Sequence, residues 1–443
     1  MHQIIRCTTF FIALLLTAFA AHAMAVKEIK TPGGITAWVV EDHTIPLIAM
    51  EFSFAGGAAL DPPGKEGATH FITGMMDEGA ADLDGPTFQA KRDELAVKLS
   101  FDAGLDNFEG SLQTLSRNRD AAFELLRKAL TAPRFEELAF RRVQNQFLVS
   151  AANNAQDPEK IASRRWMEQA FGQHPYARGS EGNEATIAKL VPDDLRAMHK
   201  RLFVKQGLTI SVVGDIDSAT LGALLDKTFG ALPEKAEGGP VSEASVAMGP
   251  QLTHIARDIP QSIIVFGSAG IKRNDPEFIP AFVAMHILGG GGLGSRLTEE
   301  VREKRGLTYG VGIGLVPLDH AGLLMGSLGT RNEKAGEAMG VIREVLTRMA
   351  QEGPTQEELD TAKTFLTGSY ALRFDSNAKI AGQLLGVQQD NLGIDYFTRR
   401  NGLIEAVTLD QVKAAAKRLL AADALIVSVV GKPEGLKSTG TGG

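Results

Sequence analysis

Two stretches of the chain share one pattern of apolar and polar positions. Residues 191–214 and 407–431 each begin with apolar residues spaced three and four apart, which predicts an amphipathic helix, and end in a β-branched run before glycine, which predicts a strand. The run Ser211–Gly214 (SVVG) recurs at Ser428–Gly431, 217 positions later, and Lys200–Leu202 (KRL) recurs at the same offset. A single offset that holds over two blocks indicates an internal duplication.

The repeat extends upstream of both blocks. An apolar run at Ile48–Phe54 predicts a strand, and it is followed by two glycines and then by Asp-Pro. Ser262–Phe266 predicts a second strand, again followed by glycines and Asp-Pro. A repeat period of this length indicates duplicated domains rather than a solenoid of short units. Residues 236–250 between the halves are rich in Glu, Gly, Ala, Ser and Pro, a composition typical of a linker.

Hydrophobic periodicity predicts further helices and strands in both halves. We expect helices at Gly85–Leu99, Ser116–Leu130, Glu136–Ala151, Pro158–Phe171, Pro276–Leu288, Arg331–Gln351 and Thr355–Ser369. We expect strands at Ala37–Val40, Ile48–Phe54, Lys98–Ala103, Phe108–Leu115, Ile210–Val213, Ser262–Gly267, Tyr309–Val316, Gly322–Gly329 and Leu425–Val430.

The first 23 residues have the pattern of a signal peptide. Arg6 supplies a positive charge, Phe10–Ala21 is an apolar run, and Ala21-His22-Ala23 offers small residues where signal peptidase cuts. The run is short for a bilayer span, although an uncleaved transmembrane anchor is the rival interpretation. We therefore expect an exported, periplasmic protein that is cut near Ala23 and has no membrane span after signal removal.

Composition and charge exclude several classes of function. The chain of 443 residues has 46 Lys and Arg against 53 Asp and Glu, and the resulting formal net charge of −7 argues against a nucleic-acid-binding protein. A hydrophobic content of 44% with 22% charged residues is typical of a globular protein rather than a disordered chain. The single cysteine, Cys7, excludes a disulfide scaffold and a cysteine-based metal site.

The block Gly67–Ala80 (GATHFITGMMDEGA) follows a predicted strand and a glycine loop. It resembles the H-x-x-E-H block of the pitrilysin/insulinase family of zinc peptidases, the inverzincins. In that family two histidines four apart on a helix bind zinc, and the glutamate activates the bound water. Here His70 matches the first histidine, but Thr73 stands at the glutamate position and Gly74 at the second histidine. The block therefore resembles a degenerate zinc site.

The remaining residues offer no evident replacement for the missing ligands. The resemblance places Val149 or Ser150 where the family has its third ligand, a glutamate. After the signal peptide, no two histidines lie closer than the 25 positions between His174 and His199, so no helical turn offers a pair. We therefore expect no metal in this chain and interpret His70 as a packed or solvated residue. A zinc site assembled from residues distant in the sequence is the remaining alternative.

A second block, Leu288–Val311 (LGGGGLGSRLTEEVREKRGLTYGV), resembles the C-domain signature of the same family. In active members an arginine and a tyrosine seven residues apart reach the zinc site, bind the substrate carbonyl and steady the oxyanion. Arg302 and Tyr309 match those positions. A charged guanidinium and a phenolic donor both suit an anionic tetrahedral intermediate. The alternatives are a solvated helix face for Arg302 and a packed sheet-edge position for Tyr309.

Four consecutive glycines lie in the same block: Gly289, Gly290, Gly291 and Gly292. The run lacks the G-K-[ST] ending of a phosphate loop, which excludes that function. The resemblance implies a flexible loop near the substrate entrance, whereas the run alone indicates only a tight turn. Ser376 and Lys379 fit S-x-x-K, a pattern of penicillin-binding enzymes, but the companion motifs are missing from the sequence and we treat the match as chance.

The resemblance covers residues 26–433 and implies the fold class. It is α+β, with two homologous α/β sandwich halves of the processing-peptidase type, each a mainly antiparallel sheet covered by helices. We expect an N-terminal domain at 24–235 with the degenerate zinc site and a linker at 236–250. A C-terminal domain with the Arg/Tyr block should follow at 251–434, and a disordered tail at 435–443.

Some family members divide the zinc ligands and the Arg/Tyr pair between two chains of about this length. This chain has the pattern of the non-zinc chain, so we expect a catalytically incomplete subunit of an exported heterodimeric zinc metallopeptidase. It would supply Arg302, Tyr309 and a chamber wall to an H-x-x-E-H partner that holds the zinc, and peptides would be the substrates. The alternatives are a non-catalytic peptide-binding or chaperone-like protein of the same fold and a structural subunit of a larger assembly. An autonomous zinc peptidase is the least supported.

Overall fold

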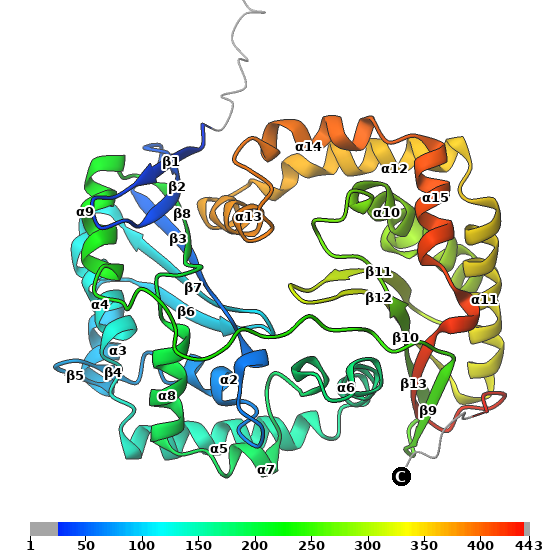
Figure 1. Ribbon diagram of the computed structural model, residues 1–443, viewed down its shortest axis with the longest axis horizontal. Coiled ribbons are helices and arrows are strands. Elements are labelled where there is room, and N and C mark those ends of the chain that lie inside the picture. Colours follow the sequence, from blue (N-terminus) through cyan, green and yellow to red (C-terminus); the bar gives the residue numbers. More distant parts are fainter. Residues whose placement is uncertain (1–24, 438–443) are drawn as a thin grey trace, which may run out of the picture.

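The computed structural model describes residues 25–437. The predicted signal peptide lies outside the described residues, and so does the predicted tail from residue 438 onward. The chain forms two large sheets, one from each half, which lie on either side of the centre of the molecule (Figure 1). None of the described helices is long and apolar enough to cross a membrane.

The first sheet has six strands in the order β1-β2-β8-β3-β7-β6. Neighbouring strands run antiparallel except for β2 and β8. The strands of this half, including a separate ribbon of β4 and β5, are β1 (Lys27–Lys30), β2 (Thr36–Glu41), β3 (Leu47–Ala55), β4 (Gly79–Ala80), β5 (Leu83–Asp84), β6 (Lys98–Ala103), β7 (Asn107–Leu115) and β8 (Thr209–Gly214). Its helices are α2 (Ala68–Thr73), α3 (Gly85–Glu94), α4 (Arg119–Thr131), α5 (Glu137–Asn154), α6 (Pro158–Phe171), α7 (Glu184–Ile187), α8 (Pro192–Leu202) and α9 (Ser218–Phe229).

The second sheet repeats this topology with five strands in the order β11-β12-β10-β13-β9, of which only β13 and β9 pair in parallel. The strands are β9 (Gln251–Ala256), β10 (Gln261–Ala269), β11 (Val311–Pro317), β12 (Gly322–Arg331) and β13 (Ile426–Gly431). The helices are α10 (Phe278–Met285), α11 (Ala335–Glu352), α12 (Gln356–Gly368), α13 (Asn377–Gln389), α14 (Tyr396–Glu405) and α15 (Leu409–Leu419). The predicted α+β fold with two related, mainly antiparallel sheets is confirmed.

The alternation of residues along β3 explains why both faces of the first sheet are covered. Met50, Phe52 and Phe54 are fully buried in the core beneath the helices of the same half. Glu51 and Ser53 point to the opposite face, because successive side chains on a strand alternate. That second face receives a helix from the other half of the chain.

One helix from each half packs against the sheet of the other half (Figure 1). α6 lies against β10 and β13, and the Trp166 indole Nε1 donates to the Ile426 carbonyl at 3.0 Å. α13 lies against β3 and β8, where Gln388 Nε2 donates to the Ile210 carbonyl at 3.1 Å and to Ser211 Oγ at 2.7 Å. Hydrogen bonds therefore tie the two halves together at both sheets.

A buried tyrosine closes a further junction between the halves. The Tyr176 hydroxyl donates to Asp106 Oδ1 at 2.5 Å and accepts from the His320 backbone N–H at 3.1 Å. Asp106 Oδ2 also accepts from the Asp319 N–H at 3.1 Å. Asp319 and His320 form the turn between β11 and β12, so the tip of this hairpin is held against the first half.

Most of the predicted elements are present, with ends that differ by a few residues. The predicted helix at Gly85–Leu99 ends at Glu94, because Ala96 adopts a positive φ of 49° and the chain then enters β6. The predicted helix at Pro276–Leu288 begins at Phe278 and passes at Met285 into a π-helical turn. The sequence patterns did not predict β1, β4, β5, β9, α7, α9, α13 and α14.

Candidate functional site

The start of α2 is fixed by a buried carboxylate in the loop before it. Asp61 is only 2% exposed and accepts from the Gly67 N–H at 2.8 Å, the Thr69 N–H at 3.0 Å and the Thr69 hydroxyl at 2.6 Å. Gly67 has a φ of 93°, a left-handed conformation that favours glycine. Burial raises the pKa of the Asp61 carboxyl to about 6, although these hydrogen bonds and Arg178 act in the opposite direction. The loop thus sets where His70 lies.

His70 is packed against an aromatic ring of α5. Its imidazole meets Phe147 edge to face, with 4.9 Å between the ring centroids. Burial lowers the pKa of His70, so packing favours the neutral imidazole. Thr73 is engaged within the helix itself, because its hydroxyl donates to the His70 carbonyl at 2.7 Å.

Phe147 also occupies the space beside Gly74. A Cβ atom at Gly74 would lie 2.8 Å from Phe147 Cε2 and 3.1 Å from Val143 Cγ1, so no histidine fits there without movement of α5 side chains. Ser150, the predicted counterpart of the third ligand, is exposed on α5. Among the described residues, no group of three or more His, Cys, Asp or Glu side chains is arranged to hold a metal ion. The residues at α2 therefore do not fit a zinc ion.

The second half contains an equivalent pair of rings. His286 begins the π-helical turn His286–Gly290 after α10 and stacks on Phe365 of α12, with 5.2 Å between centroids. Burial lowers the pKa of His286 as well. His286 lies 216 positions after His70, and Phe365 lies 218 after Phe147, so the pairs follow the internal repeat. Of these four residues, only His70 was singled out from the sequence motifs.

The residues around Arg302 and Tyr309 are anchored by side-chain contacts. Ser295 Oγ hydrogen-bonds to Thr298 Oγ1 at 3.0 Å. Arg296 forms a two-pronged ion pair with Glu358 at the start of α12, with distances of 2.6 Å and 2.7 Å. Leu297 is fully buried. The S-R-L residues of the motif, 295–297, therefore hold the following helical turn in place.

Arg302 lies on a π-helical turn, Thr298–Glu303, and its side chain is 40% exposed. Its Nε lies 3.3 Å from Glu303 Oε1, the one ion pair found for this arginine within residues 25–437. Gly306 then reverses the chain with a φ of 61°, and its N–H donates to the Arg302 carbonyl at 2.8 Å. The guanidinium thus remains within reach of solvent.

Tyr309 is 88% exposed and lies two residues before β11, so the predicted strand start at Tyr309 is corrected to Val311. The neighbouring Thr308 is buried, and its hydroxyl contacts the carbonyls of Gly310 at 2.8 Å and Gly329 at 2.7 Å. These contacts fix the backbone and leave the phenol in solvent. Within the described part of the chain, no hydrogen bond or ion pair joins Arg302 or Tyr309 to His70 of α2.

The glycine run is partly helical. Gly289 and Gly290 belong to the π-helical turn, and a Cβ at Gly289 would lie 2.8 Å from the Ile313 backbone nitrogen. Gly292 has a φ of 62° and begins a 3-10 turn. The close approach of β11 thus explains Gly289, and the chain reversal explains Gly292.

Elsewhere, Ser376 caps α13, and its Oγ accepts from the Lys379 N–H at 3.4 Å. The S-x-x-K match therefore marks the start of a helix.

A family profile and two bacterial relatives match large parts of this chain. The family profile described as "Peptidase M16 inactive domain" matches residues 189–366. The non-peptidase homolog YmxG of Helicobacter pylori is 27% identical over 369 residues, which cover 82% of this chain and 84% of that protein. An uncharacterized zinc protease of Mycobacterium tuberculosis is 29% identical over 415 residues, which cover 90% and 92% of the two chains.

Two solved structures resemble the whole described fold. A peptidase M16 inactive domain from Pseudomonas fluorescens is 31% identical with a TM-score of 0.86, and the match covers 94% of this chain and 99% of that one. A protease from Helicobacter pylori has a TM-score of 0.84, covers 92% and 99% of the two chains, and at 17% identity supports the fold alone.

Proposed function

The chain belongs to the peptidase M16 family as an inactive, non-peptidase homologue, and we propose that it is the non-zinc subunit of an exported heterodimeric zinc peptidase. The observation that carries the proposal is the contrast between its two motif blocks. At the helix that would hold zinc, Thr73 bonds to the His70 carbonyl and Phe147 packs beside Gly74. Arg302 and Tyr309, in contrast, are 40% and 88% exposed.

Solvent exposure of Tyr309 supports a role outside this chain. A tyrosine that is 88% exposed adds little to the packing of its own fold, and no hydrogen bond is found for its hydroxyl among residues 25–437. Arg302 and Tyr309 would bind the carbonyl of a peptide held at the partner's site and donate hydrogen bonds to the oxyanion that forms there. The metal chemistry would belong to the partner, a homologous subunit with H-x-x-E-H.

A second candidate function is peptide binding without catalysis. The observation in its favour is that β6 and β11 are edge strands, because each has a neighbour on one side only in its sheet. An extended peptide adds to such an edge through main-chain hydrogen bonds. This candidate predicts peptide affinity in the absence of a partner and no effect of Arg302 or Tyr309 on proteolysis.

Copurification from the native cell tests the proposal. The tagged chain would be recovered from the periplasmic fraction and assayed for a copurifying protein and for peptide cleavage that a chelator abolishes. An H-x-x-E-H partner with chelator-sensitive activity is the expected result. A chain that is recovered alone, binds peptides and has no such activity would contradict the heterodimer and favour the second candidate.

A further inference from the structure

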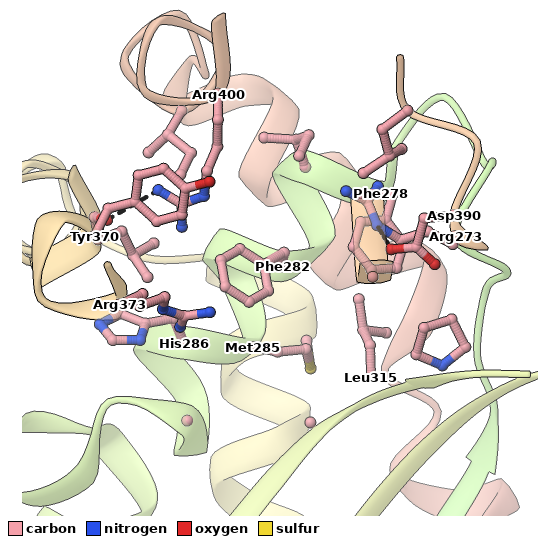
Figure 2. A pocket seen from close by; sticks show the side chains of 18 of the residues that line it. Arg273, Phe278, Phe282, Met285, His286, Leu315, Tyr370, Arg373, Asp390 and Arg400 are labelled. Atoms are coloured by element: carbon pink, nitrogen blue, oxygen red, sulfur yellow. Dashed lines mark hydrogen bonds and ion pairs between the residues drawn. The ribbon is translucent and has the colours of Figure 1, made fainter. Parts of the chain in front are cut away.

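A cavity of about 560 Å³ lies in the second half, between β11 and the helices α10, α12, α13 and α14 (Figure 2). Its lining includes His286 and Phe365, the ring pair that corresponds to His70 and Phe147 of the first half. This volume is in the range of pockets that bind small ligands or a few residues of a peptide. None of the sequence motifs pointed to it.

The cavity contains a buried cation without an acidic partner. Arg400 is 6% exposed, and its Nη1 donates to the Leu366 carbonyl at 3.1 Å and to Asn401 Oδ1 at 2.9 Å. Its guanidinium carbon lies 4.0 Å from the centre of the Tyr370 ring. In the described part of the chain no carboxylate lies within ion-pair distance of Arg400, although buried charges are normally paired.

A second unpaired guanidinium faces the same space. Arg373 lines the cavity and is exposed, and no ion pair is found for it among residues 25–437. The third arginine, Arg273, is neutralised by Asp390 at 3.1 Å and also contacts the Tyr396 hydroxyl at 3.0 Å. Figure 2 places Arg373 and Arg400 on one side of the cavity and Arg273 with Asp390 on the other. The cavity thus carries a net positive charge near Arg373 and Arg400.

The remaining walls are apolar or belong to an open sheet edge. Phe282 and Met285 lie between the two charged sides, and Leu315 lies on the side of Arg273 and Asp390 (Figure 2). Residues of β11 line the cavity, and β11 pairs with β12 alone. The turn at Gly289 packs against β11 at Ile313, so the edge that can accept a strand begins at Gly314. Gly314 of β11 has no atom within 4 Å of the position of a Cβ, which leaves its surface open.

We propose that this cavity binds the C-terminus of an extended peptide whose last residue is apolar. The terminal carboxylate would pair with Arg400 and Arg373, the apolar side chain would lie against Phe282 and Met285, and the peptide backbone would pair with β11. A terminal residue fits better than an internal Asp or Glu, because it carries an apolar side chain and a carboxylate together. This site lies wholly within the chain, so it does not rest on the proposed heterodimer.

Binding of two peptides that differ only at the C-terminus tests the site. A fluorescent peptide ending in Leu would be titrated with the full mature chain as the free acid and as the amide, with anisotropy as the readout. We expect the acid to bind at least about tenfold more tightly, which corresponds to about 1.4 kcal/mol. Equal affinities of acid and amide would overturn the proposal.

Variants test whether the two arginines cause the preference for the free-acid peptide. Arg400→Gln and Arg373→Gln should each reduce the preference for the acid, whereas Arg399→Gln, on the same helix and paired with Asp395 outside the cavity, should keep it. Arg373 is exposed, so its variant decides the outcome if Arg400→Gln does not fold. An unchanged preference in Arg373→Gln would contradict the assignment. 3-Phenylpropionate has an apolar group and a carboxylate but no peptide backbone to pair with β11. If it displaces the fluorescent peptide as well as the unlabelled free-acid peptide does, pairing with β11 contributes nothing to binding, and a peptide is ruled out as the occupant.

Discussion

Phe147 stands edge to face against His70, with the two ring planes at 87° and the centroids 4.9 Å apart. The same phenylalanine lies where a side chain at Gly74 would extend. The Phe147 ring of α5 thus occupies the space that a zinc ligand at position 74 would need. Its counterpart in the second half, His286 on Phe365, shows that both halves have an aromatic contact at this place.

Restoring the second histidine should therefore destabilise the fold. Gly74→His forces the new side chain into the Phe147 ring, and overpacking of this kind costs about 1–3 kcal/mol. Urea unfolding of Gly74→His, Phe147→Ala and the double variant measures the coupling between the two positions. We expect a smaller loss from Gly74→His when Phe147 is Ala. Losses that simply add would show that Phe147 does not obstruct the site.

The contact of α6 with the second sheet should contribute measurably to stability. Trp166→Phe removes the donor to the Ile426 carbonyl in a fully buried position, and an unsatisfied buried group costs about 1–3 kcal/mol. Trp38→Phe is the matched control, because the Trp38 indole donates to the exposed Glu28 at 3.2 Å and water can replace that bond. A loss for Trp166→Phe no larger than for Trp38→Phe, in chemical unfolding, would be the contrary result.

The stability of the fold should depend on pH through Glu51, which lies on the face of the first sheet that receives α13. Burial, with the neighbouring Glu109 carboxylate, raises the pKa of Glu51 to about 7. The folded state therefore favours the protonated acid, so stability is lost as pH rises from the unfolded value near 4.5 through 7. Glu51→Gln should raise the melting temperature at pH 8 by roughly 2 °C, since solvent screens part of the effect, and should leave it unchanged at pH 4.

An exposed change provides the control for this pH dependence. Glu94→Gln at the end of α3 removes a carboxylate that lies in solvent, and it should leave the melting temperature unchanged at both pH values. Thermal unfolding followed by circular dichroism measures all three proteins. Equal stabilisation by Glu51→Gln at pH 4 and pH 8 would show that the Glu51 carboxylate is not the titrating group.

Local signals explain which parts of the structure the sequence predicted. The helix Pro158–Phe171 was predicted end to end, because Asp157 caps its start, Pro158 suits the first turn and Gly172 follows its end. The Phe147 contact with Gly74 joins residues far apart in the sequence, and so does the packing of α13 on the first sheet. Hydrophobic periodicity reports only on neighbouring positions along the chain, so it cannot predict such contacts. The cavity around Arg400 was not predicted for the same reason, because its walls come from several distant segments.

Peptide cleavage by the assembled pair tests the central claim most directly. The chain would be reconstituted with its H-x-x-E-H partner as wild type, Arg302→Ala, Tyr309→Phe and Arg305→Ala. Arg305 is the matched control, because it belongs to the same charged run but is held by Glu300 at 2.6 Å. We predict that Arg302→Ala and Tyr309→Phe each lower kcat by about 100-fold to 1,000-fold and that Arg305→Ala does not. Full activity of the Arg302 and Tyr309 variants in an intact pair would contradict the account.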